Sequence, residues 1–267
     1  MIRKGSGTLH VRTILPKTLA FAFGFVLIAA WAVIAQEVPA TLAVIESQTP
    51  KSGMVKQYED GRKQKAAWHK QQNDALALYV WETISGEHTG TYLVGRLGQH
   101  WADLDKPVVP DQADIDEYNK VIGMYVQSVV TRYWEYMPKL SKPPDSQEPS
   151  KFSQIVTFHV RPGHDGDFHS AIVRITEAIQ KTNWPVHYLW YALASGGPTG
   201  TYVLVEPHPN WADFEEKPGM KPFEEMLKDA FGQDEAESII KRVDSSIEAE
   251  SSELIQLRPD LSYIPNK

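Results

Sequence analysis

The sequence predicts an α+β fold built from two tandem copies of one module, and two repeated motifs carry this prediction. The tetrapeptide Thr-Gly-Thr-Tyr occurs at 89–92 and again at 199–202, and the tripeptide Trp-Ala-Asp occurs at 101–103 and again at 211–213. Both motifs return after the same interval of 110 residues (199 − 89 and 211 − 101). Two separate motifs that keep one interval indicate an ungapped duplication.

Each element of the first copy follows from a local pattern. Short apolar runs predict strands, and the segment 85–90, Ser-Gly-Glu-His-Thr-Gly, is a turn between two such runs, which predicts a hairpin. Gly53 opens a helical stretch that Asn73 ends, and apolar residues at helical spacing predict a second helix. The elements expected in the first copy are a strand at 41–45, a helix over 53–72, strands at 75–84 and 91–97, a helix over 111–136 and a strand at 137–141.

The second copy repeats this order with clearer patterns. Its first helix carries Phe168, Ile172, Ile175 and Ile179 on one face. The segment 258–262 matches 137–141 at an interval of 121, so the second copy contains 11 more residues around its second helix. The elements expected in the second copy are strands at 154–160, 186–194, 201–206 and 254–257, a helix after Gly163 and a helix-rich stretch over 222–249.

The order strand, helix, strand, strand, helix, strand is that of a ferredoxin-like module (βαββαβ), in which both helices cover one face of an antiparallel sheet. The other face must also be covered, and two copies in one chain allow their sheets to pack on each other. This order, with the Gly-x-Tyr and Trp-Ala-Asp motifs, resembles the dimeric α/β-barrel superfamily, which includes antibiotic-biosynthesis monooxygenases, muconolactone isomerases and tandem chlorite dismutases. The resemblance implies an intrachain dimeric α/β barrel over about residues 40–266. It implies no particular activity, because many functions share this scaffold.

The first 35 residues have the pattern of an export signal. Four basic side chains precede a run without charge from Leu19 to Ala35, and Val33-Ile34-Ala35 resembles a signal peptidase site. We expect cleavage near Ala35 and a periplasmic or secreted protein; the alternative is an anchor retained in the inner membrane. The expected organisation is a signal peptide or membrane anchor at 1–35, a first module at 36–141, a linker at 142–151 and a second module at 152–267.

Charge and cysteine content exclude several function classes. Removing residues 1–35 leaves 23 basic side chains (27 − 4) against 34 acidic ones, a net charge of −11, which disfavours a nucleic-acid partner. The chain has no cysteine, so disulfides, thiolate metal sites and thiol catalysis are excluded. Because histidines and carboxylates also lack a ligand spacing, we expect no zinc, iron, haem or other cofactor.

The first helices of the two copies differ in chemistry. Where the second copy has Ile172, Ile175 and Ile179, the first has basic side chains at the same helical spacing, with a tyrosine above them. The four candidate residues are Tyr58, Arg62, Lys65 and His69. One interpretation is an anion site. The other, which we prefer from the sequence, is a rotated helix that buries Met54, Gly61 and Trp68 while the basic groups reach water.

Further candidates lie on the predicted strands. His159 shares a strand face with Ile155 and Thr157, and His187 could point into the same cavity, although a hydrogen-bonded or surface histidine is the commoner case. The strand pairs are rich in aromatic residues, among them the candidates Trp81 and Tyr191. The resemblance implies a barrel interior that binds flat hydrophobic molecules, whereas aromatic cross-strand pairs can also simply stabilise the sheet. We expect the aromatic strand residues in or near the space between the sheets. We also expect Trp101 and Trp211 to be largely buried and structural, with Asp103 and Asp213 as caps.

These observations predict an exported barrel protein that binds a small hydrophobic or aromatic molecule. One alternative is a cofactor-independent enzyme resembling monooxygenases or isomerases, with Tyr and His groups in one cavity; no catalytic residue can be assigned from spacing. Another is an envelope protein with a filled core that acts through protein contacts. A membrane partner is expected only if the N-terminal segment is retained, and a homo-oligomer is compatible with the sequence. A cavity between the sheets would distinguish the alternatives.

Overall fold

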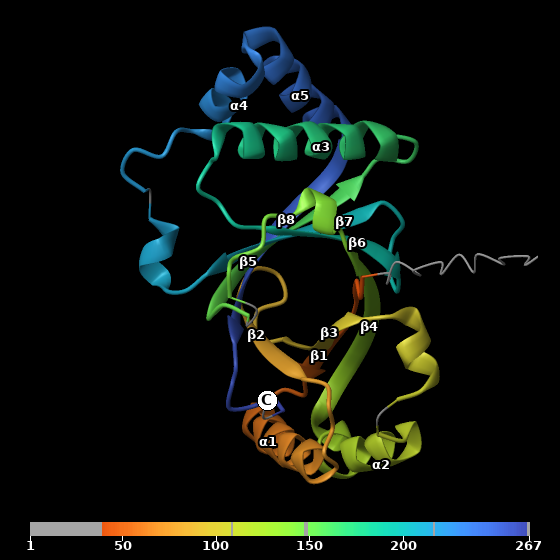
Figure 1. Cartoon of the computed structure of the whole chain (residues 1–267). Helices are drawn as coiled ribbons and strands as arrows, with labels where there is room; N and C mark the ends of the chain where they lie inside the picture. Colours follow the sequence, from red (N-terminus) through yellow and green to blue (C-terminus); the bar gives the residue numbers. More distant parts are fainter. Residues whose placement is uncertain (1–38, 108, 147–148, 216, 266–267) are drawn as a thin grey trace, which may run out of the picture. The chain divides into compact units, whose positions relative to one another are not determined.

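Eight antiparallel strands form one closed barrel in the computed structural model (Figure 1). The structure describes residues 39–107, 109–146, 149–215 and 217–265, so the predicted signal segment lies outside the described residues. Residues 39–267 form one compact unit. The elements are β1 (Leu42–Pro50), α1 (Val55–Gln71), β2 (Tyr79–Ser85), β3 (Tyr92–Gln99), α2 (Asp111–Val121), β4 (Val126–Tyr136), β5 (Phe152–Val160), α3 (Asp165–Thr182), β6 (Leu189–Ser195), β7 (Thr201–His208), α4 (Phe223–Phe231), α5 (Gln233–Ser246) and β8 (Ile247–Leu257).

The expected order of elements occurs twice, and the strands keep the expected intervals. Leu42 and Phe152, which begin β1 and β5, are 110 residues apart. Val126 and Ile247, which begin β4 and β8, are 121 residues apart. The additional residues lie between β7 and β8, where α4 and α5 occupy the place of the single helix α2. The α+β class and the barrel predicted from the sequence are therefore confirmed.

The fourth strand of each half was misplaced by the sequence analysis. The helix expected over 111–136 ends at Val121, and β4 then occupies most of its C-terminal part. In the second half, β8 begins at Ile247, within the stretch expected to be helix-rich. The pairing of β4 with both β1 and β6 explains the difference, because hydrogen bonds to two neighbouring strands outweigh a helical spacing of apolar residues.

The barrel closes through the edges of the two half-sheets. Each half has the order β4-β1-β3-β2 or β8-β5-β7-β6, and the halves join where β2 pairs with β8 and β4 pairs with β6. Every pair around this ring of eight is antiparallel. Strands in equivalent places of the two halves therefore run in the same direction on opposite walls. As a result, equivalent residues lie at similar heights across the barrel interior.

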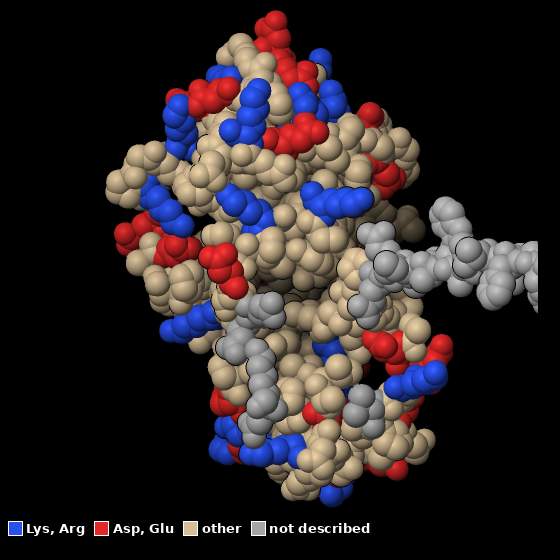
Figure 2. Space-filling model, in the orientation of Figure 1, with Lys and Arg blue, Asp and Glu red and all other residues tan. Residues whose placement is uncertain are grey.

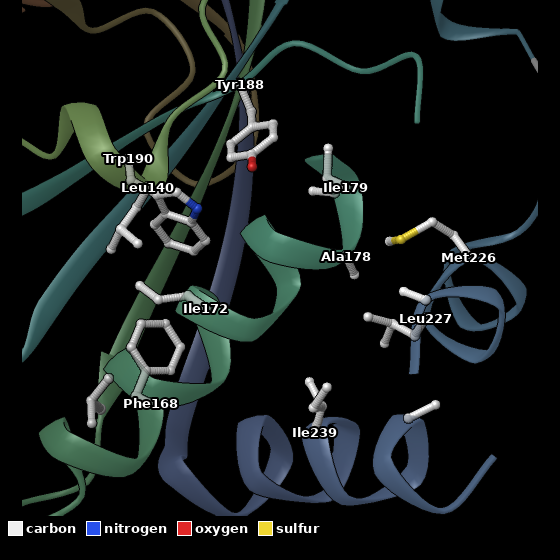
Figure 3. Close-up of a cluster of buried hydrophobic side chains, with 13 residues drawn as sticks. Leu140, Phe168, Ile172, Ala178, Ile179, Tyr188, Trp190, Met226, Leu227 and Ile239 are labelled. Atoms are coloured by element: carbon white, nitrogen blue, oxygen red, sulfur yellow. The ribbon is translucent and has the colours of Figure 1, made fainter. Parts of the chain in front are cut away.

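The helices cover the outside of the barrel, and the second half has the larger apolar core. α3 packs against α4 and α5 and buries its predicted stripe, including Phe168, Ile172 and Ile179 (Figure 3). The helix begins with Asp165 and Asp167 in its first turn and ends before Asn183, which has a left-handed backbone (φ 50°). The two aspartates stabilise the positive end of the helix macrodipole, and the left-handed asparagine caps the C-terminus. No helix in the described ranges combines the length and apolar character that a membrane span requires.

The prediction that both motif tryptophans are largely buried is wrong. Trp101 is 48% exposed and Trp211 is 55% exposed. Each begins a short 3-10 helix after a strand, so only one side of the indole meets the protein. Trp101 stacks on Tyr133 with ring centroids 5.5 Å apart, and Trp211 packs on Phe152 at 4.3 Å. As expected of a cap, the Asp103 carboxylate accepts a hydrogen bond from the backbone N–H of His100. The Asp213 carboxylate instead contacts His208 and Lys217.

Candidate functional site

The barrel interior contains a cavity of about 780 Å³, within the range of small-molecule sites. Side chains alternate along each strand, so every second residue faces the cavity. Figure 2 shows a hollow near the centre of one face; Lys and Arg side chains are interspersed with Asp and Glu over the rest of that face. All eight strands contribute apolar residues to the lining, which include Ala43, Ile45, Trp81, Leu93, Leu97, Val130, Trp134, Ile155, Leu189, Leu193, Val203, Val205 and Ile255.

One end of the cavity is polar, and its two walls are related by the repeat. Thr49 Oγ1 lies 3.2 Å from Thr91 Oγ1. At the equivalent place in the second half, His159 Nδ1 lies 3.1 Å from Thr201 Oγ1. Thr49 and His159 come from the ends of β1 and β5, while the two threonines lie where β3 and β7 begin. The imidazole therefore replaces a hydroxyl at one of two equivalent positions.

Two charged residues of the lining also occupy equivalent places. Arg132 on β4 and Glu253 on β8 are 121 residues apart. Arg132 Nη1 donates a hydrogen bond to Ser47 Oγ at 3.3 Å. Glu253 Oε1 lies 2.6 Å from His88 Nδ1 and accepts a hydrogen bond from the His88 backbone N–H at 3.0 Å. The cavity thus has a carboxylate with a local partner and, on the opposite wall, a guanidinium held by a neutral hydroxyl.

Three of the predicted site residues meet in this cavity. Trp81, His159 and Tyr191 all line it, as the strand-face alternation predicted for His159. Burial raises the pKa of Tyr191 to about 12, with a further contribution from Tyr136, so its hydroxyl stays protonated at neutral pH. His187 does not join them: it is exposed, and its Nδ1 lies 3.2 Å from the backbone oxygen of Pro143.

Only part of the aromatic set lies between the sheets. Alternate residues of a strand face opposite sides, and four of the aromatic residues face the helices. They belong to the apolar cores under the helices: Tyr92 to that of the first half, and Tyr188, Trp190 and Tyr202 to that of the second. The expectation that the aromatic strand residues lie in or near the space between the sheets is therefore correct for Trp81 and Tyr191 and wrong for these four.

The basic stripe of α1 lies outside the cavity and faces inward, contrary to the preferred sequence interpretation. Arg62 and Lys65 are each 3% exposed and His69 is 1% exposed, whereas Met54 is 39% exposed. Gly61 is buried as expected, because its Cα packs against Val121, where an added Cβ would lie 2.0 Å from the backbone oxygen. This close contact with the end of α2 fixes the rotation of α1 and turns the basic residues toward the barrel wall.

Polar partners from distant segments offset the free-energy cost of burying these side chains. The Arg62 side chain donates to Gln48 Oε1 and, through Nε at 3.1 Å, to the hydroxyl of Tyr58. Lys65 Nζ donates to the backbone oxygen of Asp114 at 2.7 Å and lies 3.0 Å from its carboxylate. Burial raises the pKa of Tyr58 to about 12, although Arg62 opposes the shift. The four candidate residues of α1 thus form two groups: Tyr58 and Arg62 meet at Gln48, and Lys65 and His69 lie beside Asp114.

In the second of these groups, His69 lies between two carboxylates. Its Nδ1 lies 3.0 Å from Asp74 Oδ2 and its Nε2 lies 3.5 Å from Asp114 Oδ1, although the geometry of neither contact is that of a hydrogen bond. Burial lowers the pKa of His69 and outweighs the opposing Asp114 and Asp74 carboxylates. Among the described residues, no group of three or more His, Cys, Asp or Glu side chains is arranged to hold a metal ion.

Several residues of the cavity lining were not predicted from the sequence. Arg132 and Trp134 were assigned to a helix, and Glu253 lay outside the strand expected at 254–257. A signal for the first two was present, because Val126, Ser128, Val130, Arg132 and Trp134 sit at every second position of a segment rich in β-branched residues. Thr49 carried no signal of its own, and the repeated Thr-Gly-Thr-Tyr motif marked Thr201 without indicating a place in a cavity. Their role depends on the contacts that barrel closure creates.

Comparisons with known proteins agree on the fold. No protein-family model and no curated protein sequence matches this chain. A "putative monooxygenase" from Fusobacterium nucleatum is similar in structure, with a TM-score of 0.54 and 13% identity over 82% of this chain and 92% of that one. Another, from Lactobacillus acidophilus, has a TM-score of 0.51 and 9% identity over 85% and 97% of the two chains. Both likenesses extend over most of the chain, so the fold expected from the sequence resemblance is supported. At such low identities the likeness extends no further than the fold.

Proposed function

We propose that this protein binds a small hydrophobic or aromatic molecule inside its barrel. The observation that carries the proposal is the cavity of about 780 Å³ with a mainly apolar lining. A space of this size would otherwise cost stability, because its walls lack packing partners. The indoles of Trp81 and Trp134 and the ring of Tyr191 offer flat apolar surfaces to a ligand. The cavity also argues against an interaction protein whose core is completely filled.

A neutral fluorescent probe tests this proposal. N-phenyl-1-naphthylamine should bind the full-length protein with increased fluorescence, and Val203→Phe should abolish that signal, because Val203 lines the cavity. The matched control is Val129→Phe, which makes the same change at a position 43% exposed on the barrel. Circular dichroism would confirm that both variants are folded. Equal binding by wild type and Val203→Phe would place the probe elsewhere and contradict the proposal.

A second candidate is an enzyme that uses the same cavity without a cofactor, resembling isomerases or monooxygenases. It is favoured by the presence of His159 and the protonated hydroxyl of Tyr191 in one lining. A neutral imidazole can accept a proton from a bound carbon acid, while a tyrosine hydroxyl can donate to the oxyanion that forms. Oxygen uptake with a panel of hydroquinones and hydrogen–deuterium exchange into 2-tetralone test the two reaction types. Absence of both reactions would leave the binding function alone.

We further propose that the chain is an exported protein made of two duplicated modules. Residues 36–141 and 152–267 would be the copies and 142–151 their linker, as supported by the matching intervals between β1 and β5 and between β4 and β8. Residues 1–35 would direct the chain across the inner membrane, with retention as an anchor as the alternative. Assembly into a homo-oligomer is compatible with the proposal, and sedimentation of the purified protein would test it.

A further inference from the structure

Arg132 is the one basic lining residue of the described cavity that projects from the middle of a strand. The residue is half-buried, and the only hydrogen bond of its side chain within the described residues goes to the neutral hydroxyl of Ser47. No carboxylate of the described residues forms an ion pair with it. A guanidinium has five N–H donors in a fixed planar arrangement. Most of its hydrogen-bonding capacity is therefore left for water or for a molecule in the cavity.

The shape around Arg132 holds this guanidinium near the polar end. Gly196 and Gly197 of the turn between β6 and β7 pass directly beside the side chain. A Cβ on Gly196 would lie 3.3 Å from Arg132 Cγ, and a Cβ on Gly197 would lie 3.6 Å from its Nε. The backbone of Gly196 has φ +97°, a conformation that favours glycine. The turn thus packs closely on the arginine stem and restricts the directions that the guanidinium can take.

The carboxylate at the equivalent position of the opposite wall, unlike Arg132, has its partners within the protein. Glu253 is satisfied by the ring and the backbone N–H of His88. The other two carboxylates of the lining, Glu87 and Asp145, are exposed and can be hydrated by solvent. Burying an unpaired charge is costly, so a half-buried arginine without a carboxylate partner favours an anionic ligand group. Thr91, Thr201 and the imidazole of His159 add hydrogen-bonding groups at the same end.

We propose that the ligand of the barrel is an amphipathic carboxylate. Its apolar or aromatic body would lie among the indoles and aliphatic side chains, and its carboxylate would be bound by Arg132. Guanidinium and carboxylate groups match in geometry and form paired, charge-assisted hydrogen bonds. This inference rests on the proposed binding function and adds the chemical class of the ligand.

Three probes of one shape test the charge of the ligand. We would titrate 2-naphthoate, neutral 2-naphthamide and cationic 2-naphthylmethylammonium into the full-length protein by isothermal titration calorimetry. Naphthoate should bind about tenfold or more tightly than naphthamide, as expected for hydrogen bonds to a charged group. The ammonium probe should bind most weakly. Equal affinities of naphthoate and naphthamide, or a preference for the ammonium probe, would overturn the inference.

Variants test whether Arg132 causes the preference for naphthoate over naphthamide. Arg132→Gln should remove the advantage of naphthoate over naphthamide, and Arg132→Lys, which keeps the charge without the planar geometry, should retain part of it. The control is Arg161→Gln, which removes one positive charge at an exposed position outside the lining. If the preference persists in Arg132→Gln, the inference fails although the binding function stands. If no probe binds, including neutral N-phenyl-1-naphthylamine, the proposed function itself fails.

Discussion

His159 and Thr49 occupy equivalent positions at the polar end of the barrel cavity, and each contacts an equivalent threonine. The distance is 3.1 Å from His159 Nδ1 to Thr201 Oγ1 and 3.2 Å from Thr49 Oγ1 to Thr91 Oγ1. The second half of the chain thus has a titratable ring where the first has a hydroxyl. This difference between otherwise similar walls provides a direct test of the enzymatic candidate.

His159→Thr would reproduce the threonine pair of the first half on the opposite wall. Because the side chain that replaces imidazole already occurs in the equivalent setting, the free energy of unfolding should change by less than about 1 kcal/mol. If His159 is a general base, exchange of deuterium into 2-tetralone should fall about 100-fold or more. His187→Thr, outside the cavity, is the control and should exchange at the wild-type rate. Unchanged exchange in His159→Thr would remove this residue from the reaction.

The buried imidazole of His69 predicts a loss of stability in acid. Its pKa in the folded protein lies below the ordinary value of 6.5, so the unfolded chain binds more protons below about that pH. Stability contributed by neutral His69 is therefore present above pH 6.5 and is lost as the pH falls below it. Asp74 acts in the same direction at lower pH. Burial would raise the pKa of Asp74, but hydrogen bonds from Arg96 and Leu76 N outweigh it and hold that pKa below 3.8.

Chemical denaturation between pH 8 and pH 4.5 measures this effect. His69→Gln should be less stable than wild type at pH 8 but should lose less stability on acidification. His187→Gln changes an exposed histidine, so its free energy of unfolding should fall with pH at the same slope as that of the wild type. Identical slopes for wild type and His69→Gln would contradict the assignment.

The Arg62 network should contribute strongly to stability although it lies outside the cavity. Arg62→Ala leaves Gln48 and Tyr58 without their common partner and opens space under α1, which should cost roughly 3 kcal/mol. Arg62→Met retains the apolar stem and should cost less. The neighbouring Lys63→Ala is the control, since its side chain is 49% exposed and pairs only weakly with Asp260. Urea unfolding of the three variants would reveal this order, and a cost for Arg62→Ala as small as that of Lys63→Ala would disprove it.

The exposed motif tryptophans should contribute less to stability than the core tryptophan. Trp190→Ala removes a ring buried against Phe158 and Phe168 and should cost about 3–5 kcal/mol. Trp211→Ala removes contacts with Phe152 and Phe214 on one side only and should cost about 1 kcal/mol. Thermal unfolding distinguishes the two. Comparable losses would mean that Trp211 is covered in solution, for instance by another copy of the chain.

Export can be tested by the mass of the mature chain. If the leader is cleaved after Val33-Ile34-Ala35, protein recovered from the periplasm or the medium should begin at Gln36 or within a few residues of it. Replacing Ala35 with Pro should block processing and leave the full-length chain in the membrane fraction. A full-length wild-type chain found only in membranes would instead support the anchor.

Several features of the fold could be predicted because they depend on local sequence. The interval of 110 residues and the order of elements identified the repeat and hence the barrel. Turn residues located both hairpins, and alternation along β5 placed His159 beside Ile155 and Thr157 in the cavity. The apolar stripe of α3 was predicted because one helix contains the whole pattern. Apart from the repeat, which compares distant segments of one sequence, each of these inferences uses residues within one element or one hairpin.

Other features were decided only by tertiary structure. The basic stripe of α1 is buried because Gln48 and Asp114 supply partners and because Gly61 allows α2 to approach; no single segment contains all three. Arg132 faces the cavity only because β4 pairs with β1 and β6, which overrides the helical spacing around it. The sequence by itself therefore determined the repeat, the hairpins and the faces of individual elements. The closed barrel decided which charges are paired and which face the cavity, because those contacts join residues far apart in the chain.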